Sequence, residues 1–133
     1  MNLVVAKQII QTYETGRPTG GAGTRTFLSD GAGLSFGQHQ ATDRADSADL
    51  VCTEYVSLGG VHAVLLTEPM KSTGKSVLQH LHDDDTTVIT SMKDLPAWAQ
   101  ELLDRLGQAA TDPIMATAQE NVFERVYFKP AID

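Results

Sequence analysis

The stretch that decides the fold is TRTFLSDGAGLSFG, residues 24–37. Residues 24–28 carry the β-branched and aromatic side chains that are typical of a strand. Asp30-Gly31 then gives a strong turn signal, and apolar residues alternate with small ones immediately after it. The pattern predicts a small antiparallel hairpin or sheet over residues 24–42.

The alternation also predicts which side chains share a face of this sheet. Successive side chains of a strand point to opposite faces. If Leu34 and Phe36 face the core, then Ser35 and His39 face the other way. We therefore expect polar groups to line one wall of a cleft beside the sheet.

Outside this region, the spacing of apolar residues is mostly helical. The predicted elements are an amphipathic helix over residues 3–13, a helical pair broken at Gly59-Gly60, a loop over 68–76, a short helix ending near 80–85, a segment over 86–91 that could be extended or lead into a helix, a helix from 94–97 to Gly107, and a last helix capped by Asp112 with Met115, Ala118, Val122, Val126 and Tyr127 inward. The predicted fold class is therefore α+β, mostly helical with one small sheet near the N-terminus.

Length and composition bound the organisation of the protein. The 133 residues are 41% hydrophobic, which is enough for one core, so we expect one domain over 1–133 or the N-terminal part of a longer one. The single cysteine, Cys52, cannot form an intrachain disulfide and reads as a buried apolar residue. No signal peptide and no transmembrane run is recognisable, so we expect no membrane insertion. The expected location is synthesis in the cytoplasm and action outside it after lysis or dedicated export.

The charge of the chain limits the kinds of partner. Seventeen acidic and ten basic side chains give a net charge of −7, with no basic patch to bind a phosphate backbone. We therefore expect no nucleic-acid partner. The same charge would attract a cationic glycan, although salt screens such attraction beyond about 10 Å.

Two carboxylates are the strongest signal of chemistry. Glu14 closes the apolar run over residues 3–13, and Asp30 opens the glycine-rich turn. A pair of carboxyl groups at the edge of a cleft is typical of glycoside hydrolysis, in which one protonates the departing sugar oxygen and the other activates water or attacks carbon. The distance between the two carboxyl groups decides the stereochemical outcome.

The order of these residues resembles that of lysozyme-like glycoside hydrolases, and most closely the chitosanase-type branch with its phage and bacterial members. That family places a glutamate on a helix before an Asp-Gly-x-Gly segment that continues into Thr-x-Gly. Here Glu14 precedes Asp30 by sixteen residues (30 − 14), and Ser35 stands in place of the threonine. Two later segments, FGQHQ at 36–40 and DPIMATAQ at 112–119 with VYFKPA at 126–131, also look like this group.

The resemblance implies roles for the three residues. Glu14 would be the general acid, Asp30 the general base, and Ser35 would help to hold the attacking water. It also implies an inverting mechanism without a cofactor, for which the carboxyl groups stand roughly 6.5–9.5 Å apart. The implied activity is hydrolysis of β-1,4 linkages in an amino-sugar polymer, either chitosan (a chitosanase) or peptidoglycan (a lysozyme-like muramidase).

Proteins of this group usually continue past the segment at 126–131 with further helices that build the second wall of the cleft. The sequence here stops at Asp133 and so departs from this pattern. Two other interpretations therefore stay open: a non-catalytic glycan-binding or assembly module, or one half of a two-chain hydrolase. A homodimer or a companion chain would then complete the cleft.

Several other side chains have both a functional and a plain structural interpretation. Gln38, His39 and Gln40 are candidates for substrate binding, although His39 could be a polar residue on an exposed strand and the two glutamines could brace the hairpin. The run from His80 to Asp85 lacks a defined zinc spacing, so we expect a solvated loop and no metal site. Trp98 lies among leucines and is predicted to be in the core.

Overall fold

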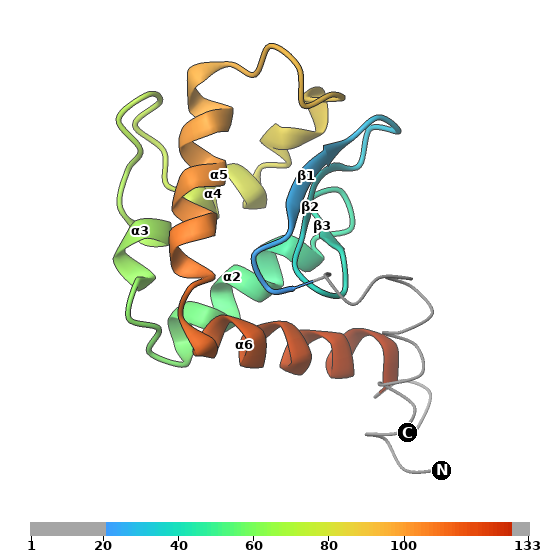
Figure 1. Cartoon of the computed structure of the whole chain (residues 1–133), viewed down its shortest axis with the longest axis vertical. Helices are drawn as coiled ribbons and strands as arrows, with labels where there is room; N and C mark the ends of the chain where they lie inside the picture. Colours follow the sequence, from blue (N-terminus) through green and yellow to red (C-terminus); the bar gives the residue numbers. More distant parts are fainter. Residues whose placement is uncertain (1–20, 129–133) are drawn as a thin grey trace.

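The computed structural model describes residues 21–128, and Figure 1 shows their arrangement. The helix predicted for residues 3–13 lies outside the described residues, and so does Glu14. Within them, a small sheet stands beside a set of helices, as the α+β prediction requires.

The sheet has three antiparallel strands in the order β1-β2-β3: β1 (Arg25–Leu28), β2 (Gly33–Phe36) and β3 (Ala41–Thr42). The register pairs Phe27 with Leu34 and Ser35 with both Thr26 and Thr42. The predicted hairpin is confirmed, and a short third strand extends it. Gly31 and Gly33 both have positive φ, at 86° and 74°, so the turn between β1 and β2 uses conformations that favour glycine.

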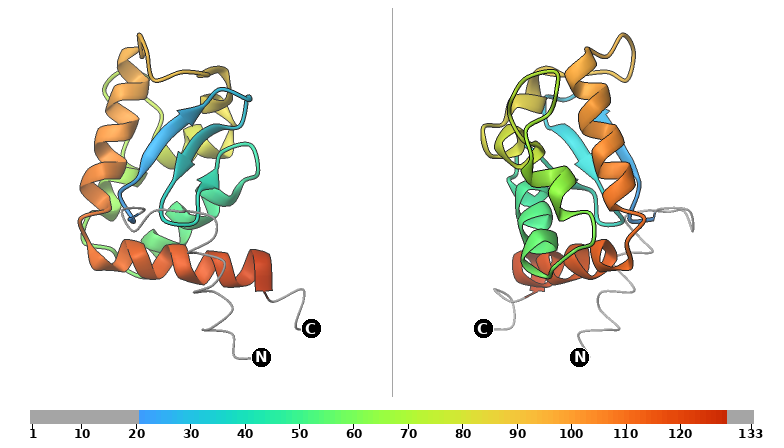
Figure 2. Two further views of the ribbon diagram at one scale, coloured as in Figure 1. Left: turned by 45° about the vertical axis from the view of Figure 1, so that its right-hand side comes forward. Right: turned by 90° about the vertical axis from the view of Figure 1, so that its left-hand side faces the viewer.

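The helical elements follow the sheet in the chain. They are α2 (Ser47–Ser57), α3 (Ala63–Thr67), α4 (Val77–His82), the 3₁₀ helix η1 (Asp85–Val88), α5 (Ala97–Ala109), α6 (Pro113–Phe123) and the π-helical turn η2 (Glu124–Phe128). The broken helical pair and the loop before α4 are as predicted. In the segment over 86–91, whose structure the sequence left open, residues 86–88 belong to η1. In Figure 2, α5 runs along one side of the sheet and α6 crosses the end of the molecule.

The start of α6 and the end of α5 were both predicted from local residues, with different outcomes. Asp112 caps α6 as predicted, because its side chain accepts a hydrogen bond from the N–H of Ile114 and Pro113 occupies the first turn. The predicted end of α5 at Gly107 is wrong, since the helix continues to Ala109. A Cβ at Gly107 would lie 2.6 Å from the guanidinium of Arg25, whose Nε donates to Leu103 O, so a side chain there would displace the end of the Arg25 side chain.

The core lies where the sheet, α2, α5 and α6 meet, and Cys52 is fully buried in it as predicted. The inward side of α6 is confirmed at Met115, Ala118 and Val122, but Val126 is 40% exposed, contrary to prediction. The change from α to π geometry at Glu124 shifts the inward face, so helical spacing no longer applies. No helix among residues 21–128 is long and apolar enough to span a membrane.

A buried polar network ties α2 to α6. The hydroxyl of Tyr55 donates to Asp112 Oδ2 at 2.9 Å and accepts from the N–H of His62, while the N–H of Val61 donates to the same carboxylate oxygen at 2.8 Å. The N–H groups of Ile114 and Val61, and to a smaller extent the hydroxyl of Tyr55, donate to the Asp112 carboxylate and hold its pKa below its usual range. Gly60 fits directly against the Tyr55 ring, so the link between α2 and α3 has no room for a side chain there.

Candidate functional site

The turn between β1 and β2 places Asp30 on the surface at one tip of the sheet (Figure 1). Its Oδ1 accepts a hydrogen bond from the N–H of Ala32 at 3.0 Å, which is the local bond by which aspartate stabilises such turns. Arg44 fastens the turn from the other side, because its backbone N–H donates to Ala32 O and its guanidinium to Asp30 O. The carboxylate of Asp30 is thus presented to solvent on a braced turn.

Ser35 lies in the middle of β2, on the strand that leads away from this turn. Its cross-strand neighbours are Thr26 on β1 and Thr42 on β3, so three hydroxyl side chains stand abreast on the face opposite Leu34 and Phe36. The predicted facing of Ser35 is therefore confirmed. Ser35 is only 5% exposed, so its hydroxyl lies below the open surface.

The candidates at 38–40 lie at the other end of β2 from Asp30. A four-residue strand is about 10 Å long, so the two turns stand at opposite tips of the sheet. The prediction that His39 faces the same way as Ser35 is wrong. The chain reverses at Gly37, which has φ 88°, and period-two alternation stops there.

His39 instead packs against α6 and is 7% exposed. Its Nε2 lies 2.8 Å from Glu120 Oε1, and its ring stacks on Phe123 with 3.9 Å between centroids. Gln38 also donates to Glu120 through Nε2, while Gln40 is exposed with φ 52°. The structure therefore uses His39 and Gln38 to join the sheet to α6, and Gln40 is not a buried brace.

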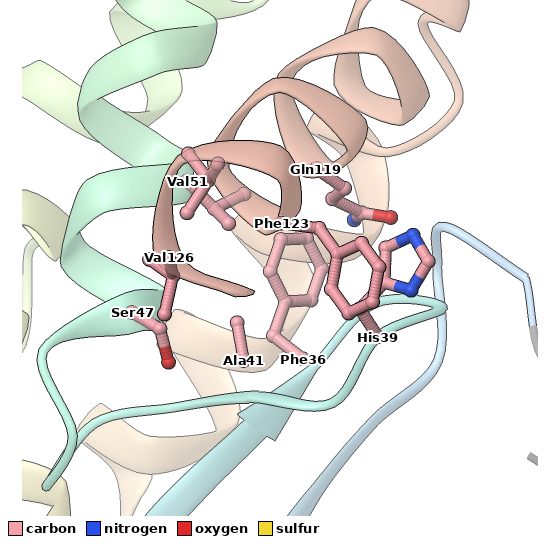
Figure 3. Close-up of a pocket in the computed structure, with 9 residues that line it drawn as sticks. Phe36, His39, Ala41, Ser47, Val51, Gln119, Phe123 and Val126 are labelled. Carbon is pink, nitrogen blue, oxygen red and sulfur yellow. The ribbon is translucent and has the colours of Figure 1, made fainter. Parts of the chain in front are cut away.

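A cavity lies beside His39 (Figure 3). Apolar side chains of the sheet, α2 and α6 line most of it, including Phe36, Val51 and Phe123. Its volume of about 10 Å³, measured as the space open to the centre of a water molecule, is room for a single water and not for a sugar ring. His39 Nδ1 is buried without a hydrogen-bond partner among the described residues. A cavity of this size gives no support to the predicted role of His39 in substrate binding.

Asp43 is a buried acid that the sequence interpretation missed. It follows β3 and is 0% exposed. Its Oδ2 accepts hydrogen bonds from both the N–H and the hydroxyl of Thr86, and its Oδ1 has no partner among the described residues. The signal was present in the alternation: if β3 continued one more residue, Asp43 would follow Ala41 on the core face.

Burial raises the pKa of Asp43 to about 6, with the two Thr86 hydrogen bonds opposing and the negative charges of Asp84 and Asp85 adding to the rise. The folded protein therefore holds a proton on Asp43 more tightly than the unfolded chain does. We expect the free energy of unfolding to fall as the pH rises from about 4 to 6, by about 1–3 kcal/mol from this group. Urea unfolding across this range measures it, with Asp43→Asn as control: the variant should lack that part of the decline, and an identical pH dependence would contradict the prediction.

A second polar cluster surrounds His80 and differs from the predicted solvated loop. His80 lies on α4, is 4% exposed and stacks on the ring of Trp98. Its Nδ1 is 2.7 Å from Asp85 Oδ2, and its Nε2 is 2.8 Å from the hydroxyl of the exposed Thr73. The order of hydroxyl, imidazole and carboxylate is that of nucleophilic hydrolases. Trp98 is half-buried against this cluster, at the margin of the core.

The loop that carries Thr73 lacks the other part of such a site. An acyl-transfer centre needs backbone N–H groups directed at the developing oxyanion. Four N–H groups of this loop already donate elsewhere: those of Lys71 and Ser72 to Glu101, that of Gly74 to Met70 O, and that of Lys75 to Thr73 Oγ1. The cluster therefore pins the loop to α4.

Metal and thiol chemistry find little support in the described part of the chain. No group of three or more His, Cys, Asp or Glu side chains among residues 21–128 is placed to hold a metal ion. Burial raises the pKa of the Cys52 thiol, so it is not a ready nucleophile.

No protein-family model matches this chain. No curated protein matches it either, and no solved structure matches its fold.

Proposed function

We propose that this protein is a glycoside hydrolase that cleaves β-1,4 linkages in an amino-sugar polymer. The observation that supports this most directly is the braced turn that presents Asp30, at the tip of a sheet whose middle strand carries Ser35. In the resemblance, these two residues are the general base and the residue that holds the attacking water. The small antiparallel sheet beside helices is also the kind of fold that the resemblance implies.

The proposed mechanism assigns one step to each group. Glu14, in its protonated form, donates a proton to the oxygen of the departing sugar. Asp30, on its exposed turn, takes a proton from a water molecule, which attacks the anomeric carbon from the opposite face and inverts it. The resemblance implies that the hydroxyl of Ser35 helps to hold that water, which must then reach below the open surface of the sheet. No cofactor takes part in this scheme.

The substrate is either chitosan or peptidoglycan. The net charge of −7 favours a cationic polymer such as chitosan, whereas the downstream segments that resemble phage proteins favour the cell wall. We propose that the site of action is outside the cytoplasm in either case.

The test is release of reducing ends by the purified chain from chitosan, peptidoglycan and cellulose, the last being a β-1,4 polymer without amino sugars. We expect release from chitosan or peptidoglycan and none from cellulose. Proton NMR of the first products should show the α-anomer, because inversion of a β-linkage gives it. A β-anomer would contradict the inverting step. Binding of either polymer without release would favour a glycan-binding module, and activity gained only on mixing with a second chain would favour a two-chain hydrolase.

A further inference from the structure

The buried pair Asp43 and Thr86 is the part of the molecule that the proposed mechanism does not use. Asp43 is completely buried, accepts two hydrogen bonds from Thr86 and leaves its second oxygen without a partner among the described residues. Burying a carboxylate with one unpaired oxygen costs stability, so the position of this group needs an explanation. The bonds of Thr86 point to one.

Thr86 lies on η1 and takes the place of a missing strand residue beside β2. Leu34 accepts a hydrogen bond at its carbonyl from the N–H of Asp43, as in an antiparallel ladder. In a regular antiparallel ladder the N–H of Leu34 would donate in return to the carbonyl of Asp43. Because β3 ends at Thr42, that N–H donates instead to Thr86 Oγ1 at 3.0 Å. The side chain of Thr86 therefore completes the edge of β2.

The direction of these bonds is set by the carboxylate. A threonine hydroxyl has one proton. Since that proton goes to Asp43, the lone pairs of Thr86 Oγ1 face the N–H of Leu34. The contact leaves no spare room: a Cβ on Gly33 would lie 2.6 Å from Thr86 Oγ1.

Leu34, whose N–H is held by Thr86, lies next to both parts of the proposed site. Leu34 is the neighbour of Ser35 in β2, and Gly33 ends the turn that begins at Asp30. Arg44, next to Asp43 in the chain, holds the same turn at Ala32 O and Asp30 O. One two-residue segment after β3 thus fastens the turn and the start of β2 to the rest of the molecule.

We infer that Thr86 and Asp43 are positioning residues, which fix the start of β2 and thereby set Ser35 and Asp30 relative to the bound polymer. This inference rests on the proposed function. It predicts a lower kcat when either residue is changed, because a small misplacement of reacting groups slows the chemical step. Substrate binding should change little, because contacts elsewhere hold the polymer. Neither residue touches the substrate.

The test compares Thr86→Val with Thr86→Ser. Valine has the shape of threonine without the hydroxyl, and serine keeps the hydroxyl. We expect Thr86→Val to lower kcat by about 10- to 100-fold with KM nearly unchanged, and Thr86→Ser to restore most of the loss. Thr87→Val is the matched control, because Thr87 adjoins Thr86 and, within residues 21–128, its hydroxyl donates to Asp84 O at the cap of η1.

A second measurement does not depend on activity. Hydrogen exchange at the amide of Leu34 should become at least about tenfold faster in Thr86→Val than in the wild type, and return towards the wild-type rate in Thr86→Ser. If the wild-type chain cleaves neither polymer, the proposed function fails. The exchange rate still decides whether Thr86 holds the N–H of Leu34. Faster exchange with unchanged kcat, or failure of serine to rescue, overturns the positioning role. If Thr86→Val does not fold, Asp43→Asn takes its place, with a smaller loss of kcat expected and no change counting against the inference.

Discussion

Replacement of Asp30 by Asn, or of Glu14 by Gln, is expected to lower the rate of reducing-end release by at least about 100-fold. General acid and base catalysis each contribute about 10²–10⁴ in rate, and an amide of the same shape neither donates nor accepts the proton. For Asp30 the geometry supports a clean test, because Asn can keep the turn by accepting from the N–H of Ala32. The variant should therefore fold normally and lose turnover.

Glu68→Gln is the control for both changes. Glu68 is an exposed carboxylate just after α3, on the side of the molecule away from the turn that carries Asp30 (Figure 1). It should retain the wild-type rate and the wild-type melting temperature. Activity of Asp30→Asn within about threefold of wild type would remove Asp30 from the mechanism, and with it the main support for a hydrolase.

Gly60→Ala is expected to destabilise the fold strongly. A Cβ at Gly60 would stand 2.1 Å from Cζ of Tyr55, a fully buried ring. The ring can move only by breaking the bonds of its hydroxyl to Asp112 and to the N–H of His62. Overpacking and the loss of these bonds together predict a decrease of about 3–5 kcal/mol in the free energy of unfolding.

Gly59→Ala separates this contact from backbone strain. Gly59 has φ 79°, which favours glycine, but a Cβ there would meet nothing within 4 Å. The expected loss for Gly59→Ala is about 1 kcal/mol, from strain alone. Guanidinium unfolding of the two variants measures the difference, and an equal or larger loss for Gly59→Ala would show that Tyr55 has more freedom to move than the packing indicates.

Most of the described fold could be predicted from local patterns of residues. Turn residues at Asp30-Gly31, the alternation around Leu34, and the cap at Asp112 followed by Pro113 each depend on neighbours within a few positions. Such signals survive in a single sequence. They failed where geometry changed locally, as at Val126 in the π-helical turn, or where a glycine served packing across the fold, as at Gly107 beside Arg25.

The candidate site divides in the same way. A catalytic role for Glu14, Asp30 and Ser35 was predicted from their spacing in the sequence, and it stays a prediction. The hydrogen-bond partners of the other polar side chains could not be predicted from the sequence. His39 joins Glu120, 81 positions away, and Thr86 joins Asp43, 43 positions away.

The sequence by itself therefore determined a mostly helical α+β fold with its small sheet, and a motif that places an aspartate on the first turn of that sheet. Only the tertiary structure decided that Gln38 and His39 serve the joint to α6, that Asp43 is buried, and that Thr86 completes the edge of β2. The physical reason is that turns and caps depend on short-range backbone geometry, whereas burial and long-range hydrogen bonds depend on which distant segments pack together.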